Sequence, residues 1–177
     1  YVEPTNECNL KCRTCIRNIW DEPLGQMNWT TFTLILKELR TFSPVPTVFF
    51  GGFGEPLAHP QIVEMVAEAK ALGTSVELIT NGTLLTQSLS RRFIEARLDV
   101  LWVSIDGTTP SSYADVRLGA ALPEVLANVK TFRDIRMKAQ LQAPEIGFAF
   151  VAMKRNINDL PSLLHMITQI ATYQASE

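Results

Sequence analysis

The sequence predicts an α/β fold in which helices cover a parallel sheet. Short apolar runs of strand length alternate with amphipathic segments of helix length along the whole of the 177 residues. The strand-like runs are continuously apolar, as in Val48-Phe49-Phe50, which is typical of strands buried on both faces. Glycine, asparagine and proline mark the junctions between successive elements. A closed barrel and an open sheet share this pattern, and periodicity leaves both open.

The elements can be placed in order. Tyr1 to Thr5 is short and extended, and it is expected to form the first of five strands. A helix is expected from Asn28 or Thr30 to about Phe42, because apolar residues recur there at helical spacing. Residues 16–27, and the segment that begins at 106, are expected to be loop. The other expected elements are strands at 47–50, 76–80, 100–105 and 145–151, and helices at 60–72, 86–97, 123–138 and 158–171, the last capped by Asn158.

Parallel strands joined by right-handed crossovers place all their strand-to-helix loops at one edge of the sheet. These loops are the cysteine segment, residues 51–56, Asn81-Gly82 and the segment from Asp106 onward. In barrels and in open parallel sheets alike, ligands bind at that carboxyl edge. The sequence therefore predicts that the four loops form a ligand site.

All three cysteines, Cys8, Cys12 and Cys15, lie in one eight-residue stretch. Three thiolates this close together suit a metal, because a cation lowers their pKa and cancels their mutual repulsion. Soft sulfur ligands favour zinc or an iron–sulfur cluster. Three ligands are one short of a closed site with four cysteines. Either a fourth ligand comes from elsewhere, or one metal position is open to a group that is not protein.

Each of these signals also has a structural interpretation. His59 or His165 would complete a zinc site, although both are expected to be surface or capping residues. The Gly51–Gly54 loop is by default a tight turn, and otherwise a phosphate cradle; Asn81-Gly82 and Asp106-Gly107 are typical turns. Arg117 is most simply a solvated charge, and the alternative is that it reaches a carboxylate group of the ligand. The functional interpretation rests on the conjunction of these signals at successive strand ends.

Composition excludes several classes of function. A net charge of -2 with scattered Lys and Arg gives no basis for a nucleic-acid partner. No apolar run approaches the roughly 20 residues that span a bilayer, so no membrane partner is expected. Clustered cysteines in odd number favour a reducing compartment, and we expect a cytoplasmic protein. The length suits one domain, residues 1–177, which we expect to be a piece of a longer chain.

Two motifs together carry a resemblance to a known family. Cys8, Cys12 and Cys15 have CxxxCxxC spacing after the first extended segment, and Gly54-Glu55-Pro56 follows the strand at 47–50. This combination resembles the radical S-adenosylmethionine (SAM) superfamily. The resemblance implies a partial (β/α) barrel that carries a [4Fe–4S] cluster on the three cysteines, with SAM on the fourth iron. Five strands are readable against the six of that family, so truncation before the sixth strand is expected.

The resemblance also implies a SAM pocket. Its expected residues are Gly52, Gly54, Glu55, Pro56, Asn81, Ser104 and Asp106. Glycines there are expected to let backbone groups come close to a small ligand. Glu55 is expected to organise its loop or the ammonium group of SAM, and not to act as a general base. Ser104 and Asp106 resemble the strand end that contacts the ribose or carboxylate of SAM.

Two positions depart from the family pattern. Thr14 stands where the family usually has an aromatic residue, which puts adenine packing there in doubt, and Phe53 replaces a glycine of the commoner Gly-Gly-Glu-Pro form. The segment from Tyr1 to Met27, especially Thr5–Leu10 and Arg17–Asp21, is similar to radical SAM maturases associated with tungsten-dependent oxidoreductases. Such maturases usually carry a C-terminal cysteine-rich domain with auxiliary clusters.

The resemblance implies an enzyme that cleaves SAM reductively to a 5′-deoxyadenosyl radical, which removes a hydrogen atom from substrate. The expected substrate is a peptide, a protein or a cofactor precursor, and the expected electron donor is a ferredoxin or flavodoxin. Two other hypotheses compete with it. One is a non-catalytic iron–sulfur or zinc-binding module, and the other is a nucleotide-binding α/β fold with structural cysteines.

Overall fold

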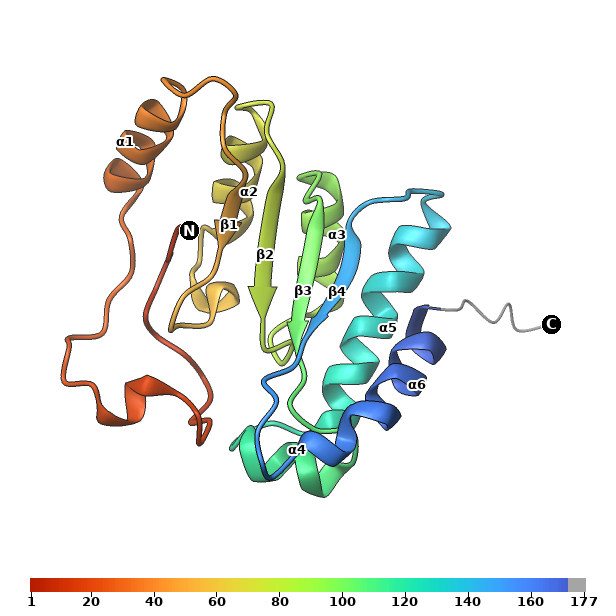
Figure 1. The fold of residues 1–177 in the computed structure, drawn as a ribbon. Coiled ribbons are helices and arrows are strands. Elements are labelled where there is room, and N and C mark those ends of the chain that lie inside the picture. The colour runs from red at the N-terminus through yellow and green to blue at the C-terminus, as the bar shows by residue number, and fades with distance from the viewer. Residues whose placement is uncertain (172–177) are drawn as a thin grey trace.

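The computed structural model describes residues 1–171 and contains one parallel sheet of strand order β1-β2-β3-β4 (Figure 1). In register, Val48 pairs with Val76 and Leu78 pairs with Leu101. The α/β fold with a parallel sheet is therefore confirmed. The strands are β1 (Val48–Phe50), β2 (Val76–Thr80), β3 (Val100–Ser104) and β4 (Glu145–Ala149).

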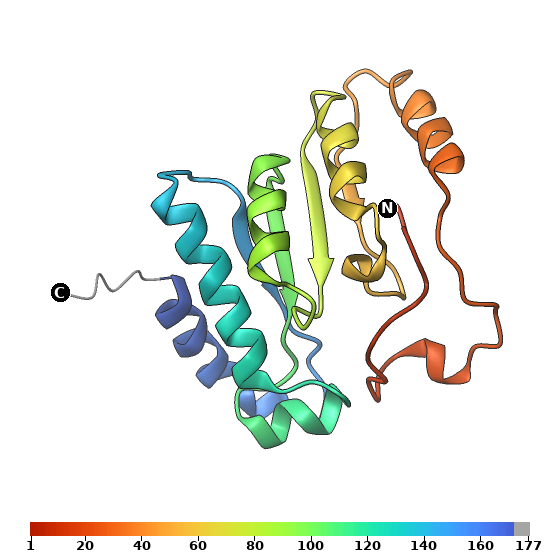
Figure 2. The same cartoon turned by 180° about the vertical axis from the view of Figure 1, so that it is seen from behind.

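The helices α2, α3 and α5 cover one face of this sheet (Figure 2). Asn28 caps the first helix, as expected, by accepting a hydrogen bond from the Thr31 N–H group at 2.8 Å. The helices are α1 (Trp29–Leu39), α2 (Ile62–Lys70), α3 (Gln87–Glu95), α4 (Pro110–Val116), α5 (Leu122–Lys138) and α6 (Leu160–Ala171). Short 3-10 turns are η1 (Ile16–Ile19), η2 (Pro56–Ala58) and η3 (Ile157–Asp159).

Three local expectations were wrong. The loop expected after Asp106 contains α4, because Thr109 and Ser112 form a reciprocal capping box ahead of Pro110. Asn158 lies inside the turn η3 and does not cap the last helix. The segment from Tyr1 is extended but forms no regular strand, since it joins β1 only through an isolated parallel bridge from Val2.

Only one face of the sheet is fully buried, in contrast to the burial on both faces that the apolar runs predict. Val48 and Phe50 are buried while Phe49 between them is half-buried, and β2 and β3 alternate in the same way. The buried face packs against the helices. The other face carries a hydrogen bond of 2.7 Å from the Trp102 indole to Glu77. Ile79 and Ser104 of this face line a cavity at the end of the strands.

The N-terminal segment carries the cysteines to the carboxyl edge of the strands (Figure 1). The Val2 N–H group donates to the Phe49 carbonyl at 2.9 Å, and Gly51 N–H donates back to Val2 at 3.1 Å. Further along, Thr5 forms an antiparallel bridge with Gln26. The cysteine loop is thereby closed at both ends, beside the loop that follows β1. Within residues 1–171, no helix has the length and apolarity needed to cross a membrane.

Candidate functional site

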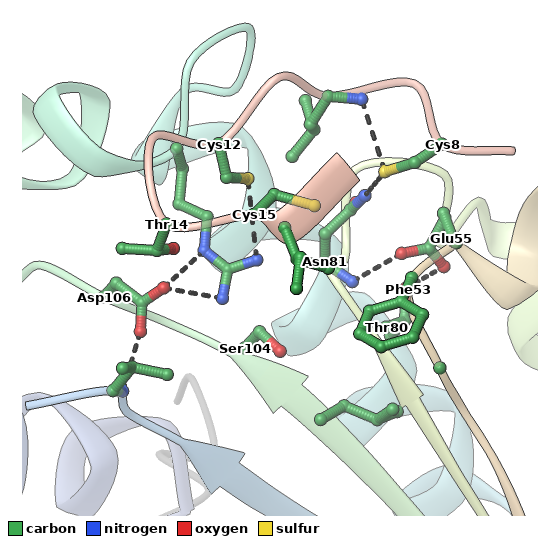
Figure 3. Close-up of a pocket in the computed structure, with 17 residues that line it drawn as sticks. Cys8, Cys12, Thr14, Cys15, Phe53, Glu55, Thr80, Asn81, Ser104 and Asp106 are labelled. Carbon is green, nitrogen blue, oxygen red and sulfur yellow. Dashed lines mark hydrogen bonds and ion pairs between the residues drawn. The ribbon is translucent and has the colours of Figure 1, made fainter. Parts of the chain in front are cut away.

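A cavity of about 320 Å³ lies at the carboxyl edge of the sheet (Figure 3). Of the residues that the sequence singles out for the site, Pro56 is buried in η2 and does not line this cavity. The cavity brings together the others, namely Cys8, Cys12, Cys15, Gly52, Gly54, Glu55, Asn81, Ser104 and Asp106. Segments 100 residues apart thus meet at one site, as the topology predicts.

The cysteine loop is held mainly by backbone hydrogen bonds. Lys11 N–H donates to the Leu118 carbonyl at 3.1 Å, and Arg13 N–H donates to the Val116 carbonyl at 2.9 Å. The carbonyl of Cys12 accepts from the side chain of Asn18 at 2.7 Å. These contacts fix the loop against the end of α4, whichever group the thiols bind.

The three cysteines are free thiols, and two of them receive N–H donors. Cys8 sulfur accepts from the Leu10 N–H group at 3.4 Å and from the Asn81 amide at 3.9 Å. Cys12 is buried, and this burial raises the pKa of its thiol, an effect that the Arg117 guanidinium opposes. Donors directed at sulfur favour the thiolate, which is the form that binds a metal.

Glu55 ties the loop after β1 to the end of β2. Its carboxylate accepts hydrogen bonds from Leu57 N–H at 3.1 Å, the Thr80 hydroxyl at 2.6 Å and Asn81 N–H at 2.7 Å. Burial raises the pKa of Glu55, and the three hydrogen bonds oppose that rise. The side chain organises its loop, one of the two roles expected for it.

The glycines of this loop allow a close contact within the protein that the sequence did not indicate. A Cβ atom on Gly54 would overlap the carbonyl oxygen of Thr5, and one on Gly52, where φ is +149°, would overlap Glu3. The space beside them is therefore filled by the N-terminal segment of the chain itself. Close approach of this loop to the cysteine-bearing segment is therefore one reason why these positions require glycine.

Asn81 and Ser104 lie where the sequence predicts, at the ends of β2 and β3. The Asn81 side chain donates to Asn9 at 3.0 Å and its oxygen accepts from the Thr83 hydroxyl at 2.6 Å. Asn81 thus joins the loop after β2 to the cysteine loop. Ser104 is half-buried and lines the cavity from the open face of the sheet.

Arg117 is not the solvated charge that the sequence suggests. Its side chain is 14% exposed, and its Nε and Nη2 atoms each lie 2.7 Å from Asp106 Oδ2, in an ion pair whose carboxylate is 1% exposed. The other oxygen of Asp106 accepts from Val151 N–H at 2.9 Å. Burial lowers the pKa of Arg117, but Asp106 and Cys12 outweigh it and the pKa is raised. The sequence gives no indication of this ion pair, because Arg117 and Asp106 meet only when the intervening segment folds into α4.

Tyr113 of α4 lies behind the cysteine loop. It is fully buried, and burial raises the pKa of its phenol to about 12. Its hydroxyl has no hydrogen-bond partner among residues 1–171. The backbone at Tyr113 is closely packed against the loop after β3, because a Cβ on Gly107 would overlap it.

Neither histidine reaches the cysteines. Of the two roles expected for His59, surface or capping, the structure shows the second: His59 is buried and is the C-cap of η2. Its ring contacts the Met27 carbonyl at 3.0 Å and accepts from Gln61 N–H at 3.1 Å. His165 is exposed on α6 beside Gln169. In the described part of the chain, no three His, Cys, Asp or Glu side chains converge on a single ion. A zinc site completed by histidine has no support from this geometry.

Aromatic side chains lie on the side of the cavity opposite Thr14. Thr14 is exposed, and Phe53 on the loop after β1 is half-exposed. The Phe53 ring packs edge-on against Trp20 with centroids 5.1 Å apart. Phe53 therefore places an aromatic ring in the cavity that Thr14 also lines.

Fold and site together define a parallel α/β protein with a cysteine-lined cofactor cavity at its strand ends. The radical SAM superfamily profile matches residues 2–166, and the chain belongs to that superfamily. It is 33% identical over 171 residues to a tungsten-containing aldehyde ferredoxin oxidoreductase cofactor-modifying protein of Pyrococcus furiosus, covering 96% of this chain and 48% of the other. The expected resemblance to maturases of this type is confirmed.

More distant similarities agree with this assignment. The chain is 25% identical to the PqqA peptide cyclase of Gluconobacter oxydans, over 96% of this chain and 45% of that protein. The crystal structure of Streptococcus suis SuiB bound to S-adenosylmethionine superposes with a TM-score of 0.77 at 16% identity, covering 95% of this chain and 37% of that one. The partial radical SAM fold is therefore confirmed. The chain spans about half the length, or less, of these curated relatives.

The residues present fit the cluster and the SAM that the superfamily implies. Three soft thiols line one wall of the cavity, and cysteine thiolates are the ligands that hold iron–sulfur clusters. Asn81 and Arg117 direct N–H groups at Cys8 and Cys12, the kind of hydrogen bond that tunes cluster sulfur. Beside the thiols, the cavity continues past Ser104 and the loop after β1.

Proposed function

We propose that residues 1–177 are one radical SAM core domain that cleaves SAM reductively. The observation that carries this proposal is a single cavity lined by Cys8, Cys12 and Cys15 together with the loops that follow β1, β2 and β3. A [4Fe–4S] cluster held by Cys8, Cys12 and Cys15 would supply the single electron needed for reductive cleavage of SAM to methionine and a 5′-deoxyadenosyl radical for hydrogen abstraction.

In this proposal the residues of this chain bind the cluster and SAM, orient them and shield them from water. Cys8, Cys12 and Cys15 hold the cluster. The SAM pocket comprises Gly52, Gly54, Glu55, Pro56, Asn81, Ser104 and Asp106, in which Glu55 and Pro56 shape the loop from behind. Asp106 has both carboxylate oxygens engaged and acts through Arg117. Ser104 is the polar group that faces the cavity and is free to contact SAM.

The substrate class follows from similarity. Relatives named as a cofactor-modifying protein and a peptide cyclase support a peptide, protein or metallocofactor precursor as substrate. A low-potential one-electron donor such as ferredoxin or flavodoxin would reduce the cluster. Free thiols in an oxygen-sensitive site favour the cytoplasm.

Anaerobic reconstitution with iron and sulfide tests the proposal. The chain should bind about four irons, and dithionite with SAM should then release 5′-deoxyadenosine. Replacing Cys15 by alanine should abolish that product, whereas Thr33→Ala on the exposed side of α1 should not change it. Full iron content without 5′-deoxyadenosine would instead indicate a non-catalytic iron–sulfur module.

A further inference from the structure

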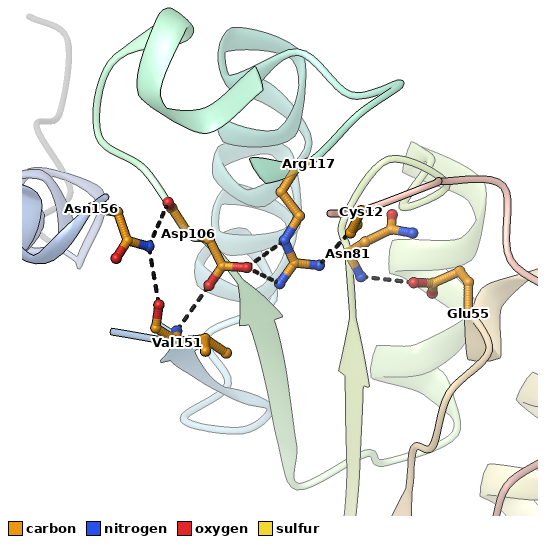
Figure 4. A network of polar contacts seen from close by, with 7 residues as sticks. All are labelled: Cys12, Glu55, Asn81, Asp106, Arg117, Val151 and Asn156. Atoms are coloured by element: carbon orange, nitrogen blue, oxygen red, sulfur yellow. Dashed lines mark hydrogen bonds and ion pairs between the residues drawn. The ribbon is translucent and has the colours of Figure 1, made fainter. Parts of the chain in front are cut away.

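A chain of polar contacts leads from the end of β4 to the cysteine loop (Figure 4). The Asn156 side chain donates to the Asp106 carbonyl at 3.1 Å and to the Val151 carbonyl at 3.0 Å. Asp106 then holds Arg117 through the Nε and Nη2 atoms. The remaining guanidinium nitrogen, Nη1, lies 4.0 Å from the sulfur of Cys12. An ordered cation is thereby directed at one cluster ligand.

The guanidinium lies between the carboxylate of Asp106 and the sulfur of Cys12 (Figure 4). Both charged side chains are shielded from water, with 14% of Arg117 and 1% of Asp106 exposed. Shielding lowers the effective dielectric constant and strengthens the field that the pair exerts. The pair is neutral overall, but its positive end faces Cys12.

We propose that Arg117 is a positioning residue that raises the reduction potential of the cluster held by Cys12, and that Asp106 limits the size of this rise. The inference rests on the proposed function. Reduction brings one electron from a low-potential donor and no proton, so the cluster and its thiolates gain one negative charge. A fixed cation stabilises that charge more than it stabilises the oxidised form.

The Arg117 side chain is not what holds the cysteine loop in place. The loop is anchored by hydrogen bonds from Lys11 N–H to Leu118 and from Arg13 N–H to Val116, both between backbone groups. These bonds do not depend on which side chain position 117 carries. Substitutions there are therefore expected to keep the loop and to change its electrostatics.

The test compares the potentials of reconstituted variants, measured by EPR at poised potentials with dithionite as reductant. In Arg117→Gln the ratio of reduced to oxidised cluster at a fixed potential should fall about tenfold, which is about 59 mV for one electron. Asp106→Asn leaves the guanidinium without its counter-charge, so the ratio should rise. Potential shifts of opposite sign in the two variants indicate an electrostatic role, because structural damage would not depend on the sign of the charge removed.

Two further variants complete the comparison. Arg117→Lys keeps the charge and should restore most of the wild-type ratio. Arg155→Gln removes the same charge from a half-exposed pair with Asp115, where water screens it, and should change the ratio less than about twofold. Lys and Gln variants at position 117 with the same potential would contradict the role of charge.

Iron content separates the two levels of the proposal. A wild-type chain that binds no iron contradicts the proposed function itself. A loaded wild type whose Arg117→Gln and Asp106→Asn variants share its potential, or shift in the same direction, overturns the inference alone. Should Arg117→Gln fail to load, Asp106→Asn decides, and a ratio that does not rise counts against the inference.

Discussion

Glu55 connects three donors from two loops, and its carboxylate is 2% exposed. In Glu55→Gln one of the two oxygens becomes an NH2 group, so a buried donor such as the Asn81 N–H group loses its acceptor. We expect the free energy of unfolding to fall by about 2 kcal/mol, measured by urea denaturation. Glu68→Gln on the exposed side of α2 is the matched control and should leave stability unchanged.

The pH dependence of the stability difference between the wild type and Glu55→Gln tests whether the pKa of Glu55 is raised. Burial raises the pKa of Glu55 in the folded state, so the folded chain binds the proton more tightly than the unfolded chain does. The stability that this group contributes is complete below its unfolded pKa of 4.5 and is lost as pH rises through the folded value. The wild type should therefore lose part of its advantage over Glu55→Gln between acidic and neutral pH. A gap that widens over this range would contradict the raised pKa.

Single residues differ in how far the sequence predicts them. Spacing was sufficient to place Cys8, Cys12 and Cys15 on one wall of a cavity, because three neighbours in one loop cannot separate. The burial of Arg117 was not predictable, since its partner Asp106 is reached only through the turn of α4. The packing of Gly54 was also not predictable, because the neighbour that fills the missing Cβ space is 49 positions earlier in the chain.

At the scale of elements, the loop after β1 and the N-terminal segment form one unit. The Glu55 N–H group donates to the Glu7 carbonyl at 2.8 Å, directly beside the contact of Gly54 with Thr5. A methyl group at position 54 would have to displace backbone and not a flexible side chain. The two segments that carry the cysteines and the Gly-Glu-Pro motif are thus positioned by each other.

Gly54→Ala tests this unit. Overpacking against backbone should lower the free energy of unfolding by about 3 kcal/mol and reduce the iron content after reconstitution. Gly25→Ala is the control, since a Cβ there meets no atom within 4 Å and stability should change by less than about 0.5 kcal/mol. Stability is measured by thermal unfolding followed by circular dichroism, and iron content by analysis of both reconstituted variants. Equal stability of the two would show that the loops adapt independently.

Regular elements were predicted well because their signals are local. Helical spacing and the cap at Asn28 placed α1 within a few residues, and apolar runs placed β1 to β4. Short elements were missed where the signal was a pair of hydrogen bonds between side chains and backbone N–H groups, as in the capping box of α4. Burial of the open sheet face was overestimated, because an apolar run does not reveal whether helices cover one face or both.

At the scale of the whole molecule, the sheet with its helices forms one body, to which residues 1–27 are added along the edge of β1. The core lies between the sheet and the helices, and its largest fully buried side chains include Phe50, Leu78, Phe93, Leu101 and Phe132. The N-terminal segment contributes few buried residues, among them Val2 and Leu10. Its attachment relies on the Val2 bridge, the pairing of Thr5 with Gln26 and the loop contacts near Leu118.

A cluster held by three cysteines of this segment should therefore stabilise one part of the molecule far more than the rest. Ligand binding stabilises the states that bind it, and local opening of a weakly attached segment is where that effect appears first.

Removing the cluster with a chelator should speed hydrogen exchange at Lys11, Arg13 and Cys15 about tenfold, a loss of about 1.4 kcal/mol of local stability. Amides of β2 and β3 should change by less than about twofold, because their hydrogen bonds break only on global unfolding. Mass spectrometry of peptides from residues 8–20, 76–80 and 100–104 separates these responses. Faster exchange in all three peptides would place the cluster within the cooperative core, and no change in any would mean that the backbone contacts to the end of α4 already hold the loop as firmly without metal.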